Sequence, residues 1–292
     1  MKGLPDRVLD HLREVIEAPD LSATRYSLEK EVGRGGMGVV YSAHDTVLDR
    51  RVALKVLSSV NTAEPRTLAQ LEHPGIVPVH DSGLLPDGRA YYVMKLVQGA
   101  RLDQFAAGHP ALPELLRVMS RICEPVAFAH AHGIIHRDLK PENVMLGPFG
   151  EVLVLDWGVA RVLGSAQHDS VAGTRGYMSP EQASGQTGAL DVRSDVFSLG
   201  RIMEYLLAST DAPQPVRAIA RKAAATDREL RYAGALDLSA DIARFLDGQP
   251  VSAYRESWRE QTLRWISHHK TLAALILTYV AIRALIFFFT RR

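Results

Sequence analysis

The sequence has little cysteine, almost no net charge and no apolar leader, and each of these scarcities narrows what the protein can be. Cys123 is its single cysteine, so no internal disulfide can form, which fits a reducing compartment. Lys and Arg number 34 against 33 Asp and Glu, so the charge balance gives no indication of nucleic-acid binding. Residues 1–20 lack the apolar stretch of a secretory signal, and we expect none.

The chain of 292 residues is long enough for one two-lobed domain or two small ones. Its apolar content of 47% and charged content of 23% are typical of globular proteins, and no repeat or low-complexity tract is found. Apolar residues at helical spacing predict a short amphipathic helix near the N-terminus. They are Leu4, Val8, Leu9, Leu12, Val15 and Ile16. We expect this helix to pack against the following domain, with docking of a partner as the alternative.

The pattern of the chain changes twice. From Tyr26 onward, β-branched and aromatic residues broken by glycines predict strands, with a further strand pair around Ile76–His80 and Ala90–Val97. From Pro113 onward, apolar residues at helical spacing dominate. The sequence therefore predicts a small β-rich lobe, a hinge near Lys95–Gly99 and a larger helical lobe.

The last part of the chain is strongly apolar. Residues 272–289 cover 18 positions (289−272+1), interrupted by Thr278 and Arg283, and span roughly 27 Å as a helix. The aliphatic and Phe side chains contribute about −3 to −7 kcal/mol to insertion, against about +2.5 to +3.5 kcal/mol for an arginine. An interfacial helix would need one polar face, which the two polar residues do not form. The sequence therefore predicts a single membrane span.

The orientation of the predicted span follows from the basic residues beside it. Four basic residues precede the span and two follow it: Arg255, Arg259, Arg264, Lys270, Arg291 and Arg292. Basic residues favour the cytoplasmic side of a membrane. We therefore expect a single-pass membrane protein whose N-terminal part is cytoplasmic.

A glycine-rich motif lies near the start of the β-rich lobe. Residues 33–38 form G-x-G-x-x-G, with glycine at Gly33, Gly35, Gly36 and Gly38. A dinucleotide-binding turn needs a helix directly afterwards, but the strand-like run 39–41 follows here. The glycines therefore indicate a hairpin tip whose N–H groups approach phosphate oxygens. Lys55 lies in the next apolar strand, where an ammonium needs an anionic partner such as a phosphate or a carboxylate.

The strongest motif is His-Arg-Asp-Leu-Lys-Pro-Glu-Asn at residues 136–143. Phosphoryl transfer to an alcohol needs a carboxylate to orient the hydroxyl, a cation near the moving phosphate and a metal ligand. Asp138, Lys140 and Asn143 supply these in order. Asp156 follows an apolar strand and precedes Trp-Gly, which suits a second Mg²⁺ ligand.

This order of motifs resembles the eukaryotic-type Ser/Thr protein kinases, a family also found in bacteria, over residues 26–246. The resemblance implies an α+β, two-lobed protein-kinase fold, to which we add the C-terminal transmembrane helix. The expected organisation is an N-terminal extension at 1–25, a β-rich N-lobe at 26–97, a helical C-lobe at 98–250, a juxtamembrane linker at 251–270 and the transmembrane helix at 271–290.

The resemblance also implies the binding site and its cofactors, ATP and Mg²⁺. Asp138 would be the catalytic base, assisted by Lys140, while Asn143 and Asp156 would bind Mg²⁺. The implied ATP site consists of Val32, Gly33, Gly35, Gly36, Gly38, Val40, Ala53, Lys55, the gatekeeper Met94, Lys95 and Val97. Protein Ser/Thr hydroxyls would be the substrates.

The implied activation segment ends at Gly173-Thr174 and Ser179-Pro180-Glu181. In the family pattern, Glu181 would pair with Arg231 and Asp195 would brace the catalytic loop. Ser165 and Ser170 are candidates for phosphorylation in this segment, with plain loop residues as the equal alternative.

Two regions depart from the family pattern. The family pattern has a helix whose glutamate pairs with Lys55, and the spacing selects Glu64 for this role. Glu64 is only nine residues after Lys55 (64−55) and is followed by Pro65. Proline is tolerated in a first helical turn, so we expect a short helix that begins near Glu64. The stretch from Gly200 to Arg231 is also short for the family.

The motifs are compatible with three functions. An active, membrane-anchored Ser/Thr protein kinase is favoured, because the residues for ATP, Mg²⁺ and base chemistry are present. An ATP-binding pseudokinase or scaffold is the alternative that the short regions suggest. A small-molecule kinase of the aminoglycoside type is disfavoured by Lys140 and by the activation segment.

Overall fold

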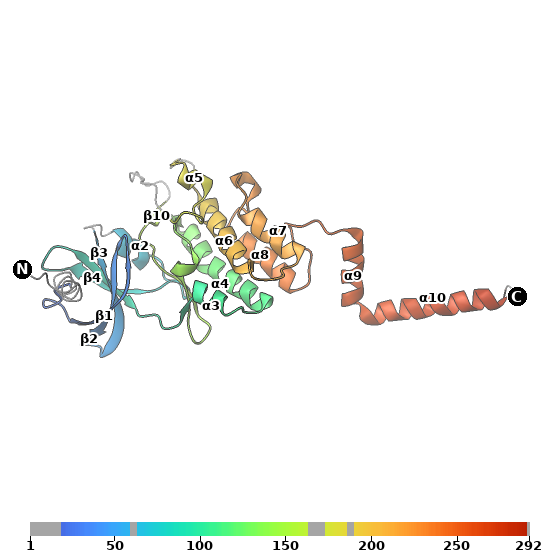
Figure 1. Ribbon diagram of the computed structural model, residues 1–292, viewed down its shortest axis with the longest axis horizontal. Coiled ribbons are helices and arrows are strands. Elements are labelled where there is room, and N and C mark those ends of the chain that lie inside the picture. Colours follow the sequence, from blue (N-terminus) through green and yellow to red (C-terminus); the bar gives the residue numbers. More distant parts are fainter. Residues whose placement is uncertain (1–18, 59–62, 163–172, 186–189, 291–292) are drawn as a thin grey trace, which may run out of the picture.

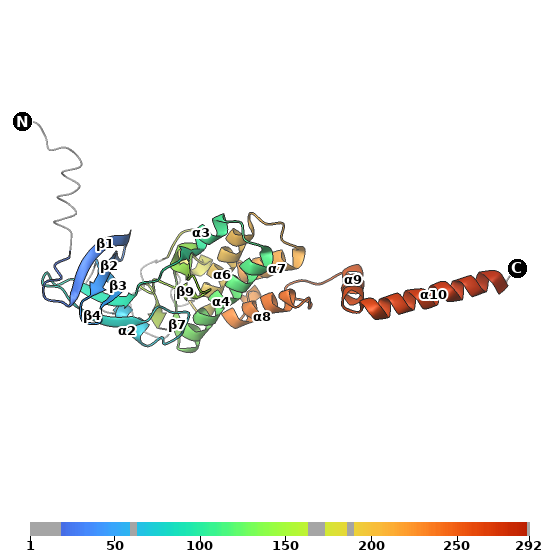
Figure 2. The same cartoon turned by 90° about the horizontal axis from the view of Figure 1, so that it is seen from below.

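The computed structural model describes residues 19–58, 63–162, 173–185 and 190–290. They form two lobes, a β-sheet lobe followed by a helical lobe, and a C-terminal pair of helices extends from the far side of the helical lobe (Figures 1 and 2). The predicted two-lobed α+β fold, with the strands first in the chain and the helices after them, is confirmed.

The N-terminal lobe is built on one five-stranded antiparallel sheet with the order β1-β2-β3-β5-β4. Its strands are β1 (Tyr26–Gly35), β2 (Gly38–Asp45), β3 (Arg50–Leu57), β4 (Val79–Leu84) and β5 (Ala90–Lys95). The glycine-rich motif is the tight connection between β1 and β2, as the β-branched run after it predicts. Gly38 has φ +149°, and a Cβ there would lie 2.1 Å from the Val56 carbonyl oxygen, so this position needs glycine.

Strand register decides which face of the sheet each side chain takes. Val40 pairs with Lys55, and Val39 pairs with Val56, in the β2–β3 ladder. Because neighbouring residues of a strand point to opposite faces, Val40 and Lys55 share the face from which Lys55 reaches the helical lobe. Val39 and Val56 lie on the opposite, outer face, which has its own apolar cluster together with Leu21.

Two elements of this lobe can be compared with the predicted ones. Helix α2 (Ala63–Ala69) is only seven residues long and has Pro65 in its first turn, which agrees with the short helix predicted there. The strand expected at Ile76–His80 lies instead at Val79–Leu84. Pro78 has no N–H to donate to the ladder, and Ile76 forms a parallel bridge with Val154 of the other lobe.

The C-terminal lobe is mainly helical. Its helices are α3 (Leu102–Ala107), α4 (Leu112–Ala131), α5 (Pro180–Ala183), α6 (Val192–Leu207), α7 (Gln214–Ala223) and α8 (Ala235–Leu246), with short 3₁₀ turns η1 (Pro141–Asn143) and η3 (Arg228–Leu230). Helix α4 packs against α6 and α8, and α7 packs against α6. Apolar residues from these four helices form one continuous core.

Short strands carry the motif residues between these helices. They are β6 (Ala100–Arg101), β7 (Ile134–Ile135), β8 (Val144–Leu146), β9 (Val152–Val154) and β10 (Arg161–Val162). β6, β8 and β9 form one antiparallel sheet, and β7 pairs with β10. Since β8 follows the catalytic-loop motif and β9 precedes Asp156, their pairing brings the two motifs together.

Where the chain leaves the helical lobe, several hydrogen bonds to the Asp241 carboxylate hold it, and we call this cluster the clamp. This carboxylate, which is fully buried, accepts the Tyr232 hydroxyl at 2.8 Å, the Ser252 N–H at 2.8 Å and the Ala253 N–H at 3.0 Å. Helices α9 (Trp258–His268) and α10 (Lys270–Thr290) follow. The clamp therefore fixes where the C-terminal helices begin.

The predicted membrane span is not confirmed by the structure. Residues 270–290 do form one continuous helix, α10. Across the described parts of the chain, however, none of the helices combines the length and the apolar character needed to cross a membrane.

Close helix packing at Gly200 gives a test of the fold. A Cβ at this position of α6 would lie 2.5 Å from the backbone nitrogen of Ala224, just after α7. We therefore expect Gly200→Ala to lower the free energy of unfolding by about 1–3 kcal/mol through overpacking, measured by urea denaturation. Gly36→Ala is the matched control, because no atom lies within 4 Å of its Cβ. Equal stability of the two variants would contradict this packing.

Candidate functional site

An ion pair between Lys55 and Asp156 joins the two lobes. The Lys55 Nζ atom lies 2.6 Å from Oδ1 of Asp156, and the lysine is 5% exposed. Lys55 comes from the central strand β3, and Asp156 follows β9 of the helical lobe. A lysine buried in an apolar strand thus has an anionic partner, as the sequence analysis requires, and that partner is a carboxylate.

The surroundings of Asp156 keep its side chain ionised. Burial raises the pKa of this carboxyl, but the adjacent Lys55 ammonium outweighs burial, so the pKa lies below its ordinary value. Its backbone has φ 60°, a left-handed conformation that is uncommon for a residue other than glycine. The next residue, Trp157, is 1% exposed, and its ring lies 4.5 Å from the His136 ring between centroids, so it is part of the core.

The catalytic-loop motif forms a hydrogen-bonded triangle around Asp138. The Thr174 hydroxyl donates to Oδ1 of Asp138 at 2.7 Å, and the Lys140 Nζ atom lies 2.9 Å from Oδ2. Lys140 also donates to the Thr174 hydroxyl at 2.8 Å. A carboxylate that accepts a hydroxyl beside an ammonium has the arrangement that phosphoryl transfer to an alcohol needs.

Asn143 and Asp156 lie close together and suit a magnesium ion. The Leu155 N–H donates to the Asn143 carbonyl at 2.8 Å, which brings Asp156 beside Asn143. The Asn143 amide nitrogen donates to the Asp138 carbonyl at 2.8 Å, so its side-chain oxygen faces away from that donor bond. One carboxylate and one amide oxygen are hard donors of the kind Mg²⁺ prefers when substrate phosphates and waters complete its shell.

A buried carboxylate on α6 holds the catalytic loop. Asp195 is fully buried and accepts the backbone N–H of His136 at 2.7 Å and of Arg137 at 2.9 Å. His130 of α4 lies 2.8 Å from the same carboxylate through Nε2. Burial raises the pKa of Asp195, but the His130 hydrogen bond and the other donors lower it below its ordinary value. His130 could not be predicted from the sequence, because a single histidine on a helix carries no motif.

Arg137 is held in an uncommon backbone conformation between two supports. Its φ is 71°, in the left-handed region. Asp195 binds its N–H, and the Gln182 side chain donates to its carbonyl at 2.9 Å. Gln182 belongs to a capping box with Ser179 at the start of α5, so the end of the activation segment buttresses the catalytic loop. Only the capping pattern in the sequence could have pointed to Gln182.

The pair implied by the resemblance between Glu181 and Arg231 is present. Two parallel hydrogen bonds of 2.7 Å and 2.9 Å join the carboxylate and the guanidinium, and both side chains are buried. Burial raises the pKa of Glu181, but the Arg231 hydrogen bonds outweigh burial and set the pKa at about 2. This pair ties α5 to the segment before α8.

The residues expected to contact ATP lie on the sheet and on the segment that leaves it. The register puts Val40, Ala53 and Lys55 on one face of β2 and β3. Val32 and three of the expected glycines lie at or near the end of β1, and Val32 is 54% exposed. Met94 and Lys95 end β5, and Val97 follows in the connection to β6.

Several predicted positions lie outside what the structure describes, among them the N-terminal helix predicted from Leu4 to Ile16. The Glu64 backbone belongs to α2, but its side chain is not among the described ones. Ser165 and Ser170 fall in residues 163–172, which are likewise outside the described residues. The Glu64 pair with Lys55 and the phosphorylation of the serines stay predictions.

Comparison with known families agrees with this geometry. Residues 26–247 match the protein kinase domain family, so the chain belongs to that family. Its relatives are bacterial Ser/Thr protein kinases of the eukaryotic type, which confirms the resemblance described above. The crystal structure of the Mycobacterium tuberculosis PknI kinase domain has a TM-score of 0.58 over 76% of this chain and 96% of that chain. At 24% identity it supports the fold alone.

Several curated proteins are similar in sequence. A probable serine/threonine-protein kinase of Streptomyces coelicolor is 37% identical, with 82% of this chain and 42% of that protein covered. Serine/threonine-protein kinase PknB of Mycolicibacterium smegmatis is 35% identical, with coverage of 80% and 45%. PrkC of Bacillus subtilis is 33% identical, with 81% of this chain and 43% of that protein covered. The chain thus spans less than half the length of these relatives.

The Glu181–Arg231 pair predicts a pH-dependent stability. The folded pKa of about 2 lies below the ordinary value of 4.5, so the ionised carboxylate stabilises the fold above pH 4.5 by about 3 kcal/mol. This contribution is lost as the pH falls from 4.5 toward 2. We therefore expect the stability gap between wild type and Glu181→Gln in urea to be large at pH 7 and to narrow from pH 5 to pH 3.

The matched control is Glu204→Gln, which removes a partner of the half-exposed Arg201. Exposed pairs contribute about 0–1 kcal/mol, so this variant should change stability little at any of these pH values. A Glu181→Gln gap that stays constant with pH would contradict the depressed pKa.

Proposed function

We propose that the protein is a Ser/Thr protein kinase that transfers the γ-phosphoryl group of ATP to protein hydroxyls. The observation that carries this proposal is the triangle of Asp138, Lys140 and Thr174, in which a carboxylate already accepts a hydroxyl at 2.7 Å beside an ammonium. Family membership over residues 26–247 supports the same chemistry.

Each side chain of the site then has a defined task. Asp138 orients the substrate hydroxyl and accepts its proton, and Lys140 lies where it can stabilise charge on the moving phosphoryl group. Lys55 is held by Asp156 on the sheet face that also carries Val40 and Ala53, and would contact the α- and β-phosphates. Asn143 and Asp156 would hold Mg²⁺, which neutralises phosphate charge when bound.

The glycine-rich hairpin and the hinge complete the proposed nucleotide site. No atom lies within 4 Å of a Cβ placed at Gly33, Gly35 or Gly36, so the space beside this backbone is open for phosphate oxygens to approach. Val32, Met94, Lys95 and Val97 would surround the nucleoside. This assignment follows the family pattern residue by residue.

Removal of the proposed base is the direct test. We expect Asp138→Asn to reduce radiolabel transfer from Mg·ATP to a generic protein substrate by about 10²–10⁴-fold, because general-base catalysis is lost. Glu142→Gln, on the same loop, is the control and should keep most of the activity. Thermal stabilisation by ATP should persist in both variants, since neither change removes Lys55. Transfer unchanged in Asp138→Asn would disprove the role of this residue.

A second candidate function is an ATP-binding scaffold with weakened catalysis. It is favoured by one observation, the seven-residue length of α2, the helix from which Glu64 would reach Lys55. Under this alternative, ATP raises the melting temperature while turnover stays at background. Turnover by the intact protein that disappears in Lys55→Met would exclude it.

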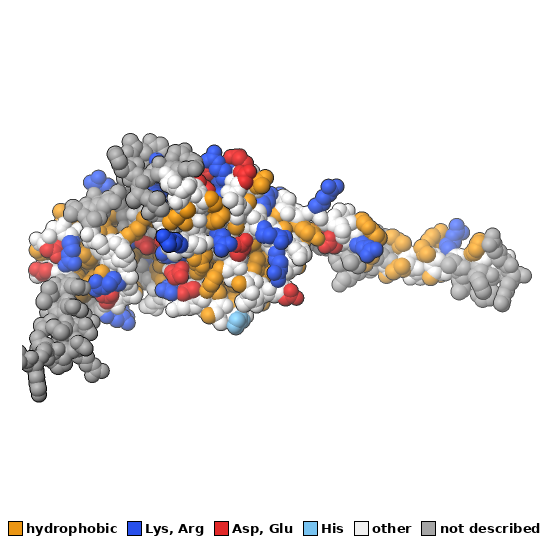
Figure 3. Space-filling view, turned by 45° about the horizontal axis from the view of Figure 1, so that its top comes forward, with side chains coloured by type: hydrophobic (Ala, Val, Ile, Leu, Met, Phe, Trp, Pro, Cys, Tyr) orange, Lys and Arg blue, Asp and Glu red, His pale blue; other side chains and the backbone are white. Residues whose placement is uncertain are grey.

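We also propose that α10 attaches the protein to a membrane, with the kinase domain on the cytoplasmic side. Apolar side chains lie along the described part of this helix on the face that Figure 3 shows. They include Leu275, Ile276, Leu277, Tyr279, Val280, Ile282, Ile286 and Phe287, all exposed. Thr278 donates its hydroxyl to the Ala274 carbonyl at 2.9 Å, and Arg283 lies over the Tyr279 ring. These contacts reduce the cost of both polar groups in a lipid environment.

The attachment can be tested by sedimentation of membranes. We expect the full chain to sediment and a chain without residues 271–292 to stay in the supernatant with its catalysis intact. Val280→Lys should weaken attachment, because it replaces an apolar side chain with a charged one that is costly to remove from water. Ile282→Leu is the matched control and should sediment like wild type. A full chain that remains in the supernatant would disprove the proposal.

A further inference from the structure

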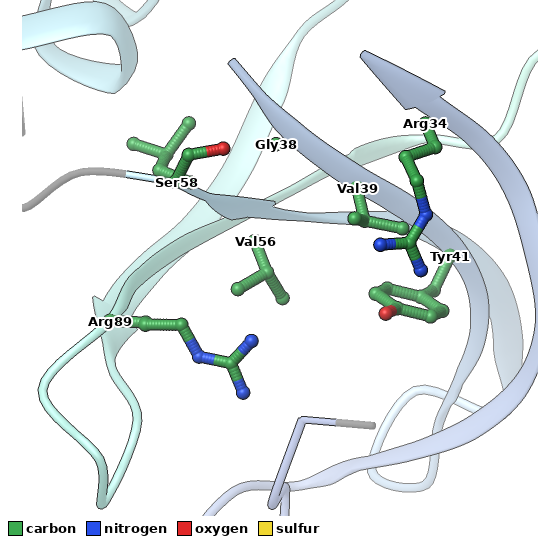
Figure 4. Close-up of a pocket in the computed structure, with 8 residues that line it drawn as sticks. Arg34, Gly38, Val39, Tyr41, Val56, Ser58 and Arg89 are labelled. Atoms are coloured by element: carbon green, nitrogen blue, oxygen red, sulfur yellow. The ribbon is translucent and has the colours of Figure 1, made fainter. Parts of the chain in front are cut away.

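A groove lies on the face of the sheet that points away from the helical lobe. It has a volume of about 400 Å³ and is lined by Val39, Tyr41, Val56 and Leu57, together with Arg34, Gly38, Ser58 and Arg89. Figure 4 shows the Val56 and Val39 side chains on its floor, with the Arg34 and Arg89 guanidinium groups extending over it from opposite sides. The proposed ATP site uses the other face of the same strands.

Strand register explains the position of the groove. Val39 and Val56 are cross-strand partners, and the next pair along the ladder is Val40 and Lys55. The groove therefore lies directly behind the pair that faces the ion-paired Asp156. Val56 is 3% exposed, but Val39 is only partly buried, so the outer apolar cluster is incomplete at this point.

The chain has an N-terminal segment long enough to reach this groove. The described residues begin at Pro19, and Leu21 is 8% exposed within the outer-face cluster that also contains Tyr41 and Val56. Eighteen residues precede Pro19, which is roughly 27 Å as a helix and enough to cross the groove. Their apolar residues recur at helical spacing and predict one continuous apolar face.

We propose that residues 4–16 dock in this groove as an amphipathic helix and complete the outer face of the sheet. Leu12 and its helical neighbours Val8 and Ile16 would cover Val39 and Val56. The aliphatic stems of Arg34 and Arg89 would form the walls, with their charged groups in solvent. The burial of each of these three apolar side chains lowers the free energy of the docked state. The segment then occupies a site that lies behind Lys55 and the glycine-rich hairpin.

Docking at this place would couple the N-terminal segment to the hairpin. Gly38 and Val39 line the groove and begin β2, while Leu57 ends the strand that carries Lys55 and Ser58 follows it. A helix on this face would restrain both strands. The docking itself does not depend on phosphoryl transfer, so it stands or falls separately from the proposed activity.

Hydrogen exchange on the full chain tests the docking. We expect Leu12→Glu to raise amide exchange in β2 and β3 peptides at least tenfold, because a charge on the apolar face prevents docking. Glu14→Gln, which is on the opposite face of the predicted helix, is the matched control and should leave exchange unchanged. Peptides of α6 and α8 should be unaffected by either change. Equal exchange in wild type and Leu12→Glu would overturn the proposal.

Cross-linking tests which segment occupies the groove. Cys123 is buried, so an added cysteine pair can be joined selectively by a short bismaleimide. We expect Leu12→Cys with Arg89→Cys to give an internal cross-link whose yield does not depend on protein concentration. Leu12→Cys with Phe149→Cys is the control and should give none, since Phe149 is 92% exposed on the helical lobe. A covalent dimer in place of the internal product would assign the groove to a second copy and overturn the proposal.

Discussion

The buried carboxylate of Asp195 is the interaction on which the geometry of the site depends. A carboxylate removed from water is costly unless several donors satisfy it, and here two backbone N–H groups and His130 do so. In return it fixes Arg137 in a left-handed conformation, which turns the chain so that Asp138, two residues after His136, meets Thr174. Glu181 and Gln182 support the same turn from the activation segment.

Contacts of very different kinds join the two lobes. Lys55 and Asp156 form a charged link, and Ile76 and Val154 form a backbone bridge with a buried apolar side chain on each residue. The bridge sits at the level of β9, and Asp156 follows two residues after it. The carboxylate that would hold Mg²⁺ is therefore positioned from both lobes, which makes its placement sensitive to their relative orientation.

Motifs of neighbouring residues could be predicted from the sequence directly, whereas the distant Glu181–Arg231 pair and the support of the catalytic loop by Asp195 were predicted only through the family resemblance. Asp138, Lys140 and Asn143 lie within one loop, and the strand after the glycine motif excluded a dinucleotide-binding turn, so these features could be predicted. His130, which contacts Asp195, and Gln182, which donates to the Arg137 carbonyl, come from separate elements without a spacing rule of their own. The boundary of β4 was wrong because Pro78 and the bridge at Ile76 are tertiary constraints that local β-propensity does not express.

The clamp at Asp241 has a mechanical consequence. The clamp fastens Ser252 and Ala253 to α8, and α8 packs on α4, so a force applied to the C-terminal helices acts on the core of the helical lobe. The sheet lies at the opposite end, beyond the catalytic loop (Figure 1). Attachment at the C-terminus would therefore restrain the helical lobe but not the sheet lobe. The sheet lobe could still move relative to the helical lobe during nucleotide exchange.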